Sequence, residues 1–176
     1  MANKGKYYES QFEEATIELL HESHWQYAFG DDIHRKYTDP LIEEDLRNFL
    51  AVQYKDKNLT TSEMDSIVAN LRNTGGQNDY YALRNAFLLY RDGYDFAYSD
   101  GRDNPFRLEY IDFEHPDHNI FRCVNQFVME QGRENRRPDI LLFINGIPVC
   151  IIELKNPTNQ NATIRDAHTQ ICTRYM

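Results

Sequence analysis

The sequence lacks the features of membrane, secreted and zinc-knuckle proteins. It contains no run of about 18 apolar residues, and its first residues lack the apolar stretch of a signal peptide. The three cysteines, Cys123, Cys150 and Cys172, are odd in number and form no C-x-x-C pair. Neither a disulfide framework nor a zinc knuckle is therefore predicted. We expect an unexported, soluble protein of the cytoplasm with no membrane partner.

Positive charge is also scarce. The chain holds 19 Lys and Arg residues against 28 Asp and Glu residues, and its formal net charge is −9. A field of this sign repels nucleic acid and anionic membranes. If the chain contacts DNA, other chains or segments must supply much of the attraction.

Several catalytic motifs are absent as well. The sequence has no G-x-x-x-x-G-K-[ST], G-x-G-x-x-G, G-x-S-x-G or H-E-x-x-H pattern. Nucleotide motors, dinucleotide enzymes, the common serine hydrolases and zincins therefore find no support within this chain. Carboxylate chemistry remains.

The 176 residues, 41% of them hydrophobic, suit one compact domain spanning residues 1–176. Apolar periodicity predicts an acidic helix over Glu9–Glu22 and a final helix over Ala162–Tyr175. Between them, helix-start and helix-stop signals predict a helical insert of residues 40–92. It includes a helix that follows the capping box Thr60-x-x-Glu63 and one over Tyr80–Arg91 that Gly93 ends.

The second half of the chain favours strands. Short β-like runs cover Asp95–Tyr98, Phe106–Ile111 and Ile120–Phe127. The clearest signal is a hairpin in which the apolar runs 140–144 and 147–152 flank Asn145-Gly146. Since both runs are continuously apolar, we expect both faces of the hairpin to be covered. The predicted fold class is α/β, with a mixed central sheet flanked by the first and last helices.

Ionisable residues bracket this hairpin. Asp139 stands at its entrance, and Glu153-Leu154-Lys155 stands at its exit. Strand alternation places Glu153 and Lys155 on one face. Asp139 and Glu153 offer the hard oxygen ligands that Mg²⁺ prefers, and Lys155 could orient a water or stabilise phosphate charge.

The register of the hairpin tests this arrangement. An unbulged two-residue turn would place Asp139 opposite Ile152 and Glu153 on the other face. We therefore predict a three-residue loop with a bulge at Gly146, or a bulge elsewhere, such as beside Pro148, that brings both carboxylates to one face.

The extended motif resembles a known family. Pro138-Asp139, thirteen residues and Glu153-x-Lys155 is similar to the PD-(D/E)xK nuclease motif. The wider strings, NRRPDILLF over 135–143, NGIP over 145–148 and IELKNP over 152–157, resemble the N-terminal endonuclease domain of type I restriction R subunits. Asn125-Gln126-Phe127 before the hairpin also fits this family. The resemblance implies a restriction-endonuclease-like fold and metal-dependent hydrolysis of DNA phosphodiester bonds.

The resemblance also implies roles for individual residues. Asp139, Glu153, the Leu154 carbonyl and Glu13, with Glu9 as the alternative, would hold Mg²⁺, for which Mn²⁺ could substitute. Lys155 would orient or activate the attacking water. Gln170 and Tyr175 would match a Gln-x-x-x-Tyr motif on the last helix, although one extra residue turns Tyr175 about 140° from Gln170 rather than about 40°. Arg136 and Arg137, with Arg133, are either DNA contacts or structural residues.

In such R subunits an ATP-driven motor follows the nuclease domain. The implied partners are double-stranded DNA, the motor domains of the same chain, and the methylation and specificity subunits. ATP would bind only to the motor domains, which this sequence does not contain. Two alternatives remain: a docking or coupling module that is inactive in isolation, and an independent PD-(D/E)xK repair nuclease.

Two further patterns receive structural interpretations. The pairs His115/His118 and His21/His24 have spacings that a metal could use, but we see no second ligand group and assign them to a turn and a helix surface. We assign the aromatic residues of the predicted helix over Tyr80–Arg91 to core packing rather than base stacking: Tyr80, Tyr81, Phe87 and Tyr90.

Overall fold

The computed structural model describes residues 9–75, 77–131, 134–154 and 164–174. The chain divides into two compact units. The first joins Met1–Pro40 to Phe121–Met176, and the second is Leu41–Ile120. None of the described helices is long and apolar enough to cross a membrane.

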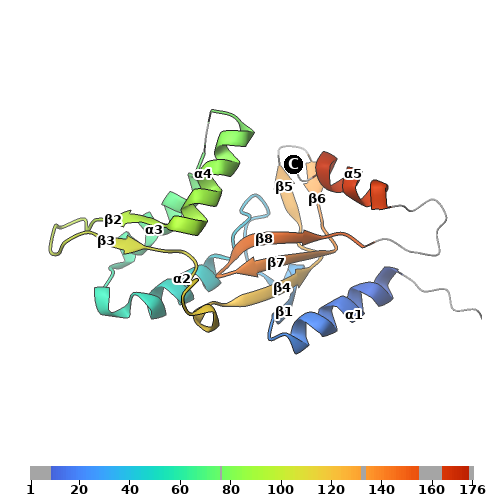
Figure 1. Ribbon diagram of the computed structural model, residues 1–176, viewed down its shortest axis with the longest axis horizontal. Helices are drawn as coiled ribbons and strands as arrows, with labels where there is room; N and C mark the ends of the chain where they lie inside the picture. The colour runs from blue at the N-terminus through green and yellow to red at the C-terminus, as the bar shows by residue number, and fades with distance from the viewer. Residues whose placement is uncertain (1–8, 76, 132–133, 155–163, 175–176) are drawn as a thin grey trace, which may run out of the picture. The chain divides into compact units, whose positions relative to one another are not determined.

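The first unit contains a four-stranded mixed sheet of order β1-β4-β7-β8 (Figure 1). Its strands are β1 (Gln26–Phe29), β4 (Phe121–Asn125), β7 (Ile140–Ile144) and β8 (Ile147–Ile152). β1 runs parallel to β4, and the other pairs are antiparallel. The predicted α/β class with a mixed central sheet is confirmed.

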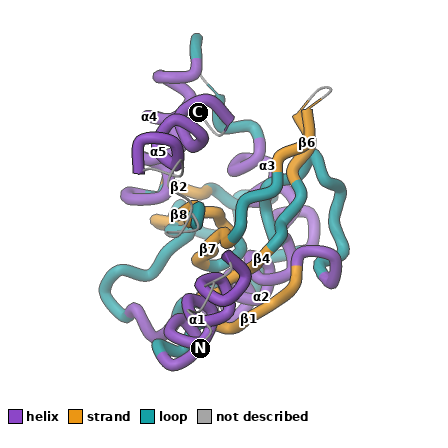
Figure 2. Tube along the Cα trace, turned by 90° about the vertical axis from the view of Figure 1, so that its right-hand side faces the viewer, coloured by secondary structure: helices purple, strands orange, loops and turns teal. Residues whose placement is uncertain are grey.

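Helices and a second hairpin complete this unit. Its helices are α1 (Glu9–Glu22) and α5 (Ile164–Arg174), with a short 3-10 helix η1 (Gly30–Asp32) after β1. The hairpin consists of β5 (Met129–Gln131) and β6 (Glu134–Arg136) and forms its own two-stranded sheet (Figure 2). The sequence analysis missed both this hairpin and β1.

The β7–β8 hairpin contains the predicted bulge. Ile144 pairs with Ile147 around a two-residue turn, and both turn residues have positive φ, 51° at Asn145 and 75° at Gly146. This is the backbone that an Asn-Gly hairpin turn requires. The register then shifts between Phe143, opposite Pro148, and Leu142, opposite Cys150. Val149 is thus the extra residue, next to a proline that has no N–H for the ladder.

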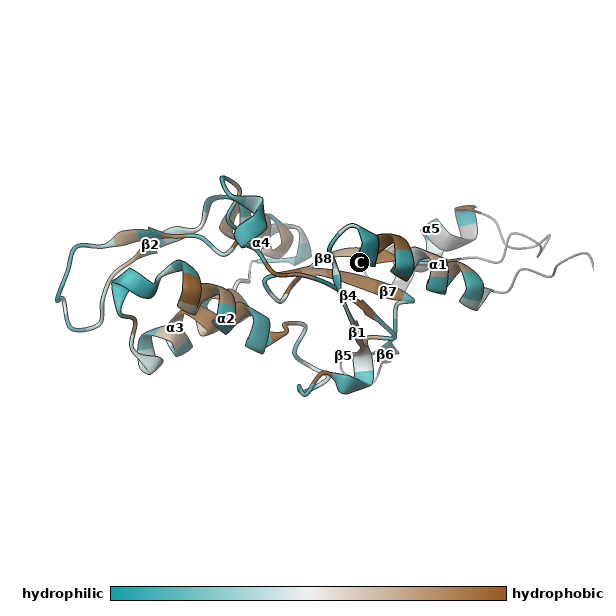
Figure 3. Ribbon diagram, turned by 90° about the horizontal axis from the view of Figure 1, so that it is seen from below, coloured by the Kyte–Doolittle hydropathy of each residue, from teal (hydrophilic) through white to brown (hydrophobic). Residues whose placement is uncertain are grey.

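The sheet packs apolar side chains into the core of the first unit. Phe127 and Phe143 are fully buried, with their ring centroids 5.0 Å apart. β7 and β8 are mostly apolar (Figure 3). However, Val149 is 43% exposed and Cys150 is exposed. The expectation that both faces of the hairpin are covered is therefore wrong for this part of β8.

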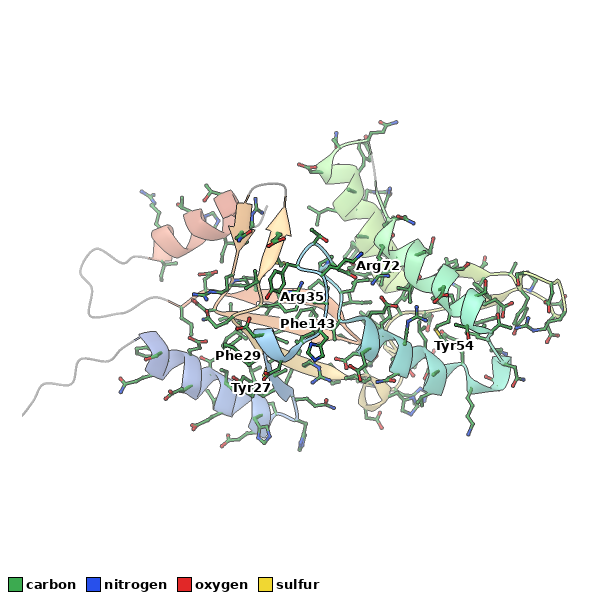
Figure 4. The ribbon with its side chains drawn as sticks, turned by 180° about the vertical axis from the view of Figure 1, so that it is seen from behind. Tyr27, Phe29, Arg35, Tyr54, Arg72 and Phe143 are labelled. Carbon is green, nitrogen blue, oxygen red and sulfur yellow. The ribbon has the colours of Figure 1, made fainter. Side chains whose placement is uncertain are left out.

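Arg35 fixes the segment that follows β4 (Figure 4). Its guanidinium lies 3.4 Å from the centroid of the Phe127 ring and donates hydrogen bonds to the carbonyls of Asp39 and Val128. Burial lowers the pKa of Arg35. A cation over an aromatic face combined with carbonyl acceptors stabilises the loop on the core.

The second unit is largely helical, as predicted for the insert. Its elements are α2 (Glu43–Gln53), α3 (Thr61–Arg72), α4 (Asp79–Asp92), β2 (Tyr94–Phe96) and β3 (Phe106–Leu108), with 3-10 helices η2 (Lys55–Lys57) and η3 (Pro116–His118). β2 and β3 pair only with each other among the described strands. The unit extends to Ile120, beyond the predicted insert of residues 40–92.

Glu63 links the start of α3 to the loop after β2. The capping box is present as predicted: Thr60 Oγ1 accepts from the Glu63 amide, and Glu63 Oε2 accepts from the Thr60 amide. The carboxylate is 2% exposed and also bonds Ser99 and Arg102. The Arg102 guanidinium, together with the Thr60 amide, holds the pKa of Glu63 well below its usual range.

The aromatic side chains at the start and middle of helix α4 do not pack in the core as predicted. None of its residues is buried, and Tyr80, Tyr81 and Phe87 are 70%, 46% and 59% exposed. Apolar residues at helical spacing mark one face of a helix but do not identify what covers it. The core-packing interpretation is wrong for these three side chains.

Candidate functional site

The bulge in β8 brings Asp139 opposite Glu153. Ile140 pairs with Ile152, and carrying this register one position further pairs Asp139 with Glu153. Residues directly opposite each other in an antiparallel pair project from the same face. The predicted bulge is therefore confirmed, beside Pro148 and not as a three-residue loop with a bulge at Gly146, and the register that it sets is the one that a shared face for Asp139 and Glu153 requires.

A hydrogen bond fixes the Asp139 carboxylate against the end of β8. The Leu154 amide donates to Asp139 Oδ2 over 2.7 Å. Asp139 is half-buried and follows Pro138, which is buried. The bond uses one carboxylate oxygen, and the other can still accept a ligand.

Glu153 is also half-buried, and its Oε1 is shielded from solvent. A carboxylate out of bulk water interacts more strongly with a cation than an exposed one does. Asp139, Glu153 and the neighbouring carbonyl of Leu154 therefore form an oxygen-rich donor set at one end of the hairpin.

Glu13 of α1 is held by the residues at the end of β4. Its Oε1 accepts hydrogen bonds from Asn125 Nδ2 over 2.9 Å and from Gln126 Nε2 over 3.3 Å. Gln126 in turn donates its backbone N–H to the carbonyl of Asp139 over 3.2 Å. These bonds connect α1, β4 and the start of β7.

Gln126 connects Glu13 to the Asp139 backbone. Among the described residues, Glu13, Asp139 and Glu153 are not identified as a group of three ligands that could hold a metal ion. Whether Glu13 contributes directly or through a water stays a prediction. The side chain of Glu9, the alternative, lies outside the described side chains.

Tyr27 of β1, labelled in Figure 4, orients Asn125. Its hydroxyl donates to Asn125 Oδ1 over 2.9 Å, so the other end of the amide, Nδ2, faces Glu13. Burial, followed by the nearby Glu13 carboxylate, raises the pKa of the Tyr27 phenol. The phenol is thus kept as a hydrogen-bond donor at neutral pH.

Gly30 makes room for the backbone of Gln126. Gln126 has a positive φ of 57°, a conformation that costs energy for a residue other than glycine. A Cβ atom on Gly30 would lie 2.4 Å from the Gln126 carbonyl oxygen. The sequence analysis missed Tyr27 and Gly30, and it noted Asn125 and Gln126 only as matching residues. A glycine directly after the short segment Gln26–Phe29 is too weak a signal to identify such a contact.

The remaining predicted site residues lie toward the ends of the described segments or outside them. Lys155 and Tyr175 lie outside the described residues, as does Arg133. Gln170 lies on α5, and its side chain is not among the described ones. Arg136 ends β6 and is half-buried, whereas Arg137 is exposed. Their roles stay predictions.

The chain is similar in sequence to known proteins over nearly its whole length. Residues 6–176 match the family model described as "Type I restriction enzyme R protein N terminus". The chain is 29% identical over 175 residues to the "Type I restriction enzyme HindI endonuclease subunit" of Haemophilus influenzae, covering 94% of this chain and 16% of that protein. It is also 29% identical over 163 residues to the "Putative type I restriction enzyme MjaIXP endonuclease subunit" of Methanocaldococcus jannaschii, covering 88% of this chain and 16% of that protein.

The chain thus spans about a sixth of the length of these curated relatives. The resemblance drawn from the strings around Asp139 and Glu153 is confirmed, because the family model covers nearly the whole chain rather than these strings alone. The protein belongs to the family of type I restriction enzyme R protein N termini.

Proposed function

We propose that this chain is the Mg²⁺-dependent endonuclease domain of a type I restriction R subunit, with residues 1–176 as one PD-(D/E)xK nuclease domain. The substrate is double-stranded DNA, and the reaction is hydrolysis of its phosphodiester bonds. One observation carries the proposal: the bulge at Val149 pairs Ile140 with Ile152, a register that, continued by one position, would set Asp139 opposite Glu153, and the Leu154 amide bonds Asp139. The names of the relatives, endonuclease subunits of type I restriction enzymes, support it.

The donor set suits Mg²⁺. Asp139, Glu153 and the Leu154 carbonyl would hold the ion, and they offer only oxygen ligands, which Mg²⁺ prefers; Mn²⁺ accepts the same donors. Glu13 would act through a water. The chemistry that the ion supplies when bound is Lewis-acid stabilisation of charge on the scissile phosphate.

The protein's own residues would position the reactants. The Leu154 amide orients the carboxylate of Asp139, and Asn125 and Gln126 orient that of Glu13. Strand alternation would place Lys155, two positions after Glu153, on the same face as Glu153. There Lys155 would orient or activate the attacking water. Pre-positioned groups of this kind lower a barrier chiefly by removing the cost of ordering them during the reaction.

DNA would be held mainly by other parts of the enzyme. A net charge of −9 gives little long-range attraction for phosphate, so the motor domains and the specificity and methylation subunits would supply most phosphate contacts. Within this chain Arg136, Arg137, Gln170 and Tyr175 are the proposed contacts. ATP would act only through the motor domains of the full-length subunit.

Calorimetric titration of Mg²⁺, and separately of Mn²⁺, tests the metal site. We expect binding to the wild-type chain and its loss in Glu153→Ala, with circular dichroism confirming that the variant is folded. Glu130→Ala is the matched control, because Glu130 is an exposed glutamate of the same unit. Equal binding by the wild type and Glu153→Ala, with and without duplex DNA, would refute Glu153 as a ligand.

Cleavage tests the catalytic role. An R subunit carrying Lys155→Ala, assembled with its methylation and specificity subunits and supplied with ATP, should hydrolyse ATP but fail to cut DNA. Full cleavage by this variant would overturn the role of Lys155. Cleavage by the 176-residue chain alone would instead favour an independent nuclease.

A further inference from the structure

Two histidines and an aspartate of the second unit direct ligand atoms to one point. His118 Nδ1 lies 3.0 Å and His115 Nδ1 lies 3.6 Å from Asp112 Oδ2. The ligand atoms of all three residues lie within 4.8 Å of one another. Asp112 is the ligand group that the sequence analysis failed to find for this histidine pair.

The loop that carries these residues is held in place by its own hydrogen bonds. Asp112 Oδ1 accepts from the amides of Glu114 and His115, over 3.1 and 2.8 Å. Asn119 closes the other end: its Oδ1 accepts from the Asp112 amide, and its Nδ2 donates to the Asp112 carbonyl. The 3-10 helix η3, with Pro116 at its start, sets the spacing between the two histidines.

The hydrogen-bonding position of Asp112 that faces the histidines is occupied by His118. The residue is 5% exposed, and Gln53 of α2 donates to its Oδ2 over 3.0 Å. An ionised carboxylate accepts about four hydrogen bonds. The two loop amides and Gln53 fill three of these positions, and His118 Nδ1 fills the fourth, on Oδ2, at 3.0 Å. A metal ion bound by both residues would take the place of this hydrogen bond.

We propose that Asp112, His115 and His118 form a Zn²⁺ site with an open fourth position. Imidazole and carboxylate ligands suit Zn²⁺, and three protein ligands plus water are a common arrangement. With Zn–ligand distances of about 2.0–2.1 Å, the ligand atoms of a tetrahedral site lie about 3.3 Å apart. The separations of 3.0 and 3.6 Å bracket this value.

The imidazole rings need to turn on binding. They are stacked, with centroids 4.9 Å apart and planes inclined by 19°, whereas a metal lies near the plane of each ring that ligates it. The two side chains are 61% and 50% exposed, so each ring can rotate about its Cβ–Cγ bond without disturbing the core. The amide of Gln53 acts as the outer partner that holds the Asp112 carboxylate.

Titration of Zn²⁺ into the tag-free 176-residue chain tests this site. The exposed thiols Cys150 and Cys172 are first replaced by serine, because Cys172 lies 3.6 Å from His168 and could bind zinc itself. We expect one Zn²⁺ per chain that millimolar Mg²⁺ fails to displace. Loss of an outer partner of a metal ligand typically weakens metal binding about 10–100-fold, and Gln53→Ala should weaken zinc binding within that range. His115→Gln and His118→Gln each remove a ligand itself and should weaken zinc binding at least as much.

Two comparisons separate this site from the nuclease site. Asp117→Asn, an exposed acidic residue in the same turn, should bind zinc as the parent chain does, and so should Asp139→Asn. Zinc should raise the melting temperature of the parent but not of His118→Gln. Unchanged zinc stoichiometry and affinity in a His115→Gln/His118→Gln double variant would overturn the proposal, as would no binding to the folded parent chain.

Discussion

Asn125 donates its side-chain N–H to Glu13 over 2.9 Å, joining the last residue of β4 to a helix 112 positions earlier in the chain. The same amide accepts the hydroxyl of Tyr27. One side chain thus fixes the first helix to two neighbouring strands. The position of the Glu13 carboxylate depends on this amide as well as on the helix that carries it.

Replacement of Asn125 should therefore impair the site more than the fold. We expect Asn125→Ala to lower Mg²⁺ affinity by no more than about 10-fold, the low end of the effect of removing a residue that orients a direct ligand, because Glu13 would act through a water, and to destabilise the chain by about 1–2 kcal/mol. Calorimetry and urea denaturation measure the two effects. Asn135→Ala is the control, because Asn135 is exposed on β6. Unchanged Mg²⁺ affinity in Asn125→Ala would show that Glu13 and Asn125 do not contribute to the metal site.

Insertion of one alanine between Cys150 and Ile151 should separate the two carboxylates. With the bulge at Val149 kept, the added residue shifts the pairing by one position, so Asp139 would face Ile152 and Glu153 would project from the opposite face. We expect Mg²⁺ binding to be lost in a chain that circular dichroism shows to be folded.

Deletion of Val149 is the matched comparison for this insertion, because removing the extra residue keeps Leu142 opposite Cys150 and therefore keeps Asp139 opposite Glu153. It should bind Mg²⁺ as the wild type does. Retained Mg²⁺ binding in a folded insertion variant would show that the register does not set the site.

Gly30→Ala should destabilise the first unit. The new Cβ atom would lie 2.4 Å from the Gln126 carbonyl oxygen. Because the Cβ atom is bonded to the backbone and the oxygen is part of it, the clash can be relieved only if the backbone moves. We expect a loss of about 1–3 kcal/mol, the range for overpacking, measured by urea denaturation. Gly75→Ala provides the comparison, because its nearest contact would be 3.8 Å away; it should be nearly neutral or slightly stabilising. Equal effects at the two glycines would contradict the close approach.

The pKa of Glu63 predicts an acid-sensitive second unit. The carboxyl is held below its unfolded value of about 4.3, so ionised Glu63 contributes stability above that pH and loses the contribution as pH falls toward the folded pKa. We expect the urea concentration at the unfolding midpoint of the wild type to decrease as the pH is lowered from about 5 to about 3, as the linkage between protonation and unfolding requires. The decrease should be smaller in Glu63→Gln.

Glu63→Gln should also be less stable than the wild type at pH 7, because it weakens the bonds to Arg102 and Thr60. Glu109→Gln is the control, since Glu109 is exposed and its substitution should leave the pH dependence unchanged. Parallel pH profiles for the wild type and Glu63→Gln would rule out Glu63 as the source.

Local signals predicted the elements that depend on neighbours in sequence. Helix α1 has the predicted bounds, and the capping box of α3 and the turn at Asn145-Gly146 form as expected. Each depends on contacts within a few residues, which a sequence pattern contains directly. The bulge followed from a parity argument, because only an extra residue could place Asp139 and Glu153 on one face.

The missed features depend on distant partners. Strand β1 has four residues and is defined by parallel pairing with β4, nearly a hundred positions later. The strand-like run at Asp95–Tyr98 pairs with Phe106–Leu108 instead of joining the central sheet. Likewise, the bonds from Asn125 and Gln126 to Glu13 and the approach of Gly30 to Gln126 arise only in three dimensions. No periodicity within one segment encodes them.

The bulge of β8 also bears on solubility. Among the described strands of the central sheet, β8 has a neighbour on one side only, and it contains two successive exposed residues, Val149 and Cys150. An open apolar edge of this kind invites pairing with a second chain. Pro148 removes one edge donor, and the irregularity at Val149 interrupts the regular ladder that an incoming strand would need. The local distortion that aligns two carboxylates therefore also protects the sheet against aggregation.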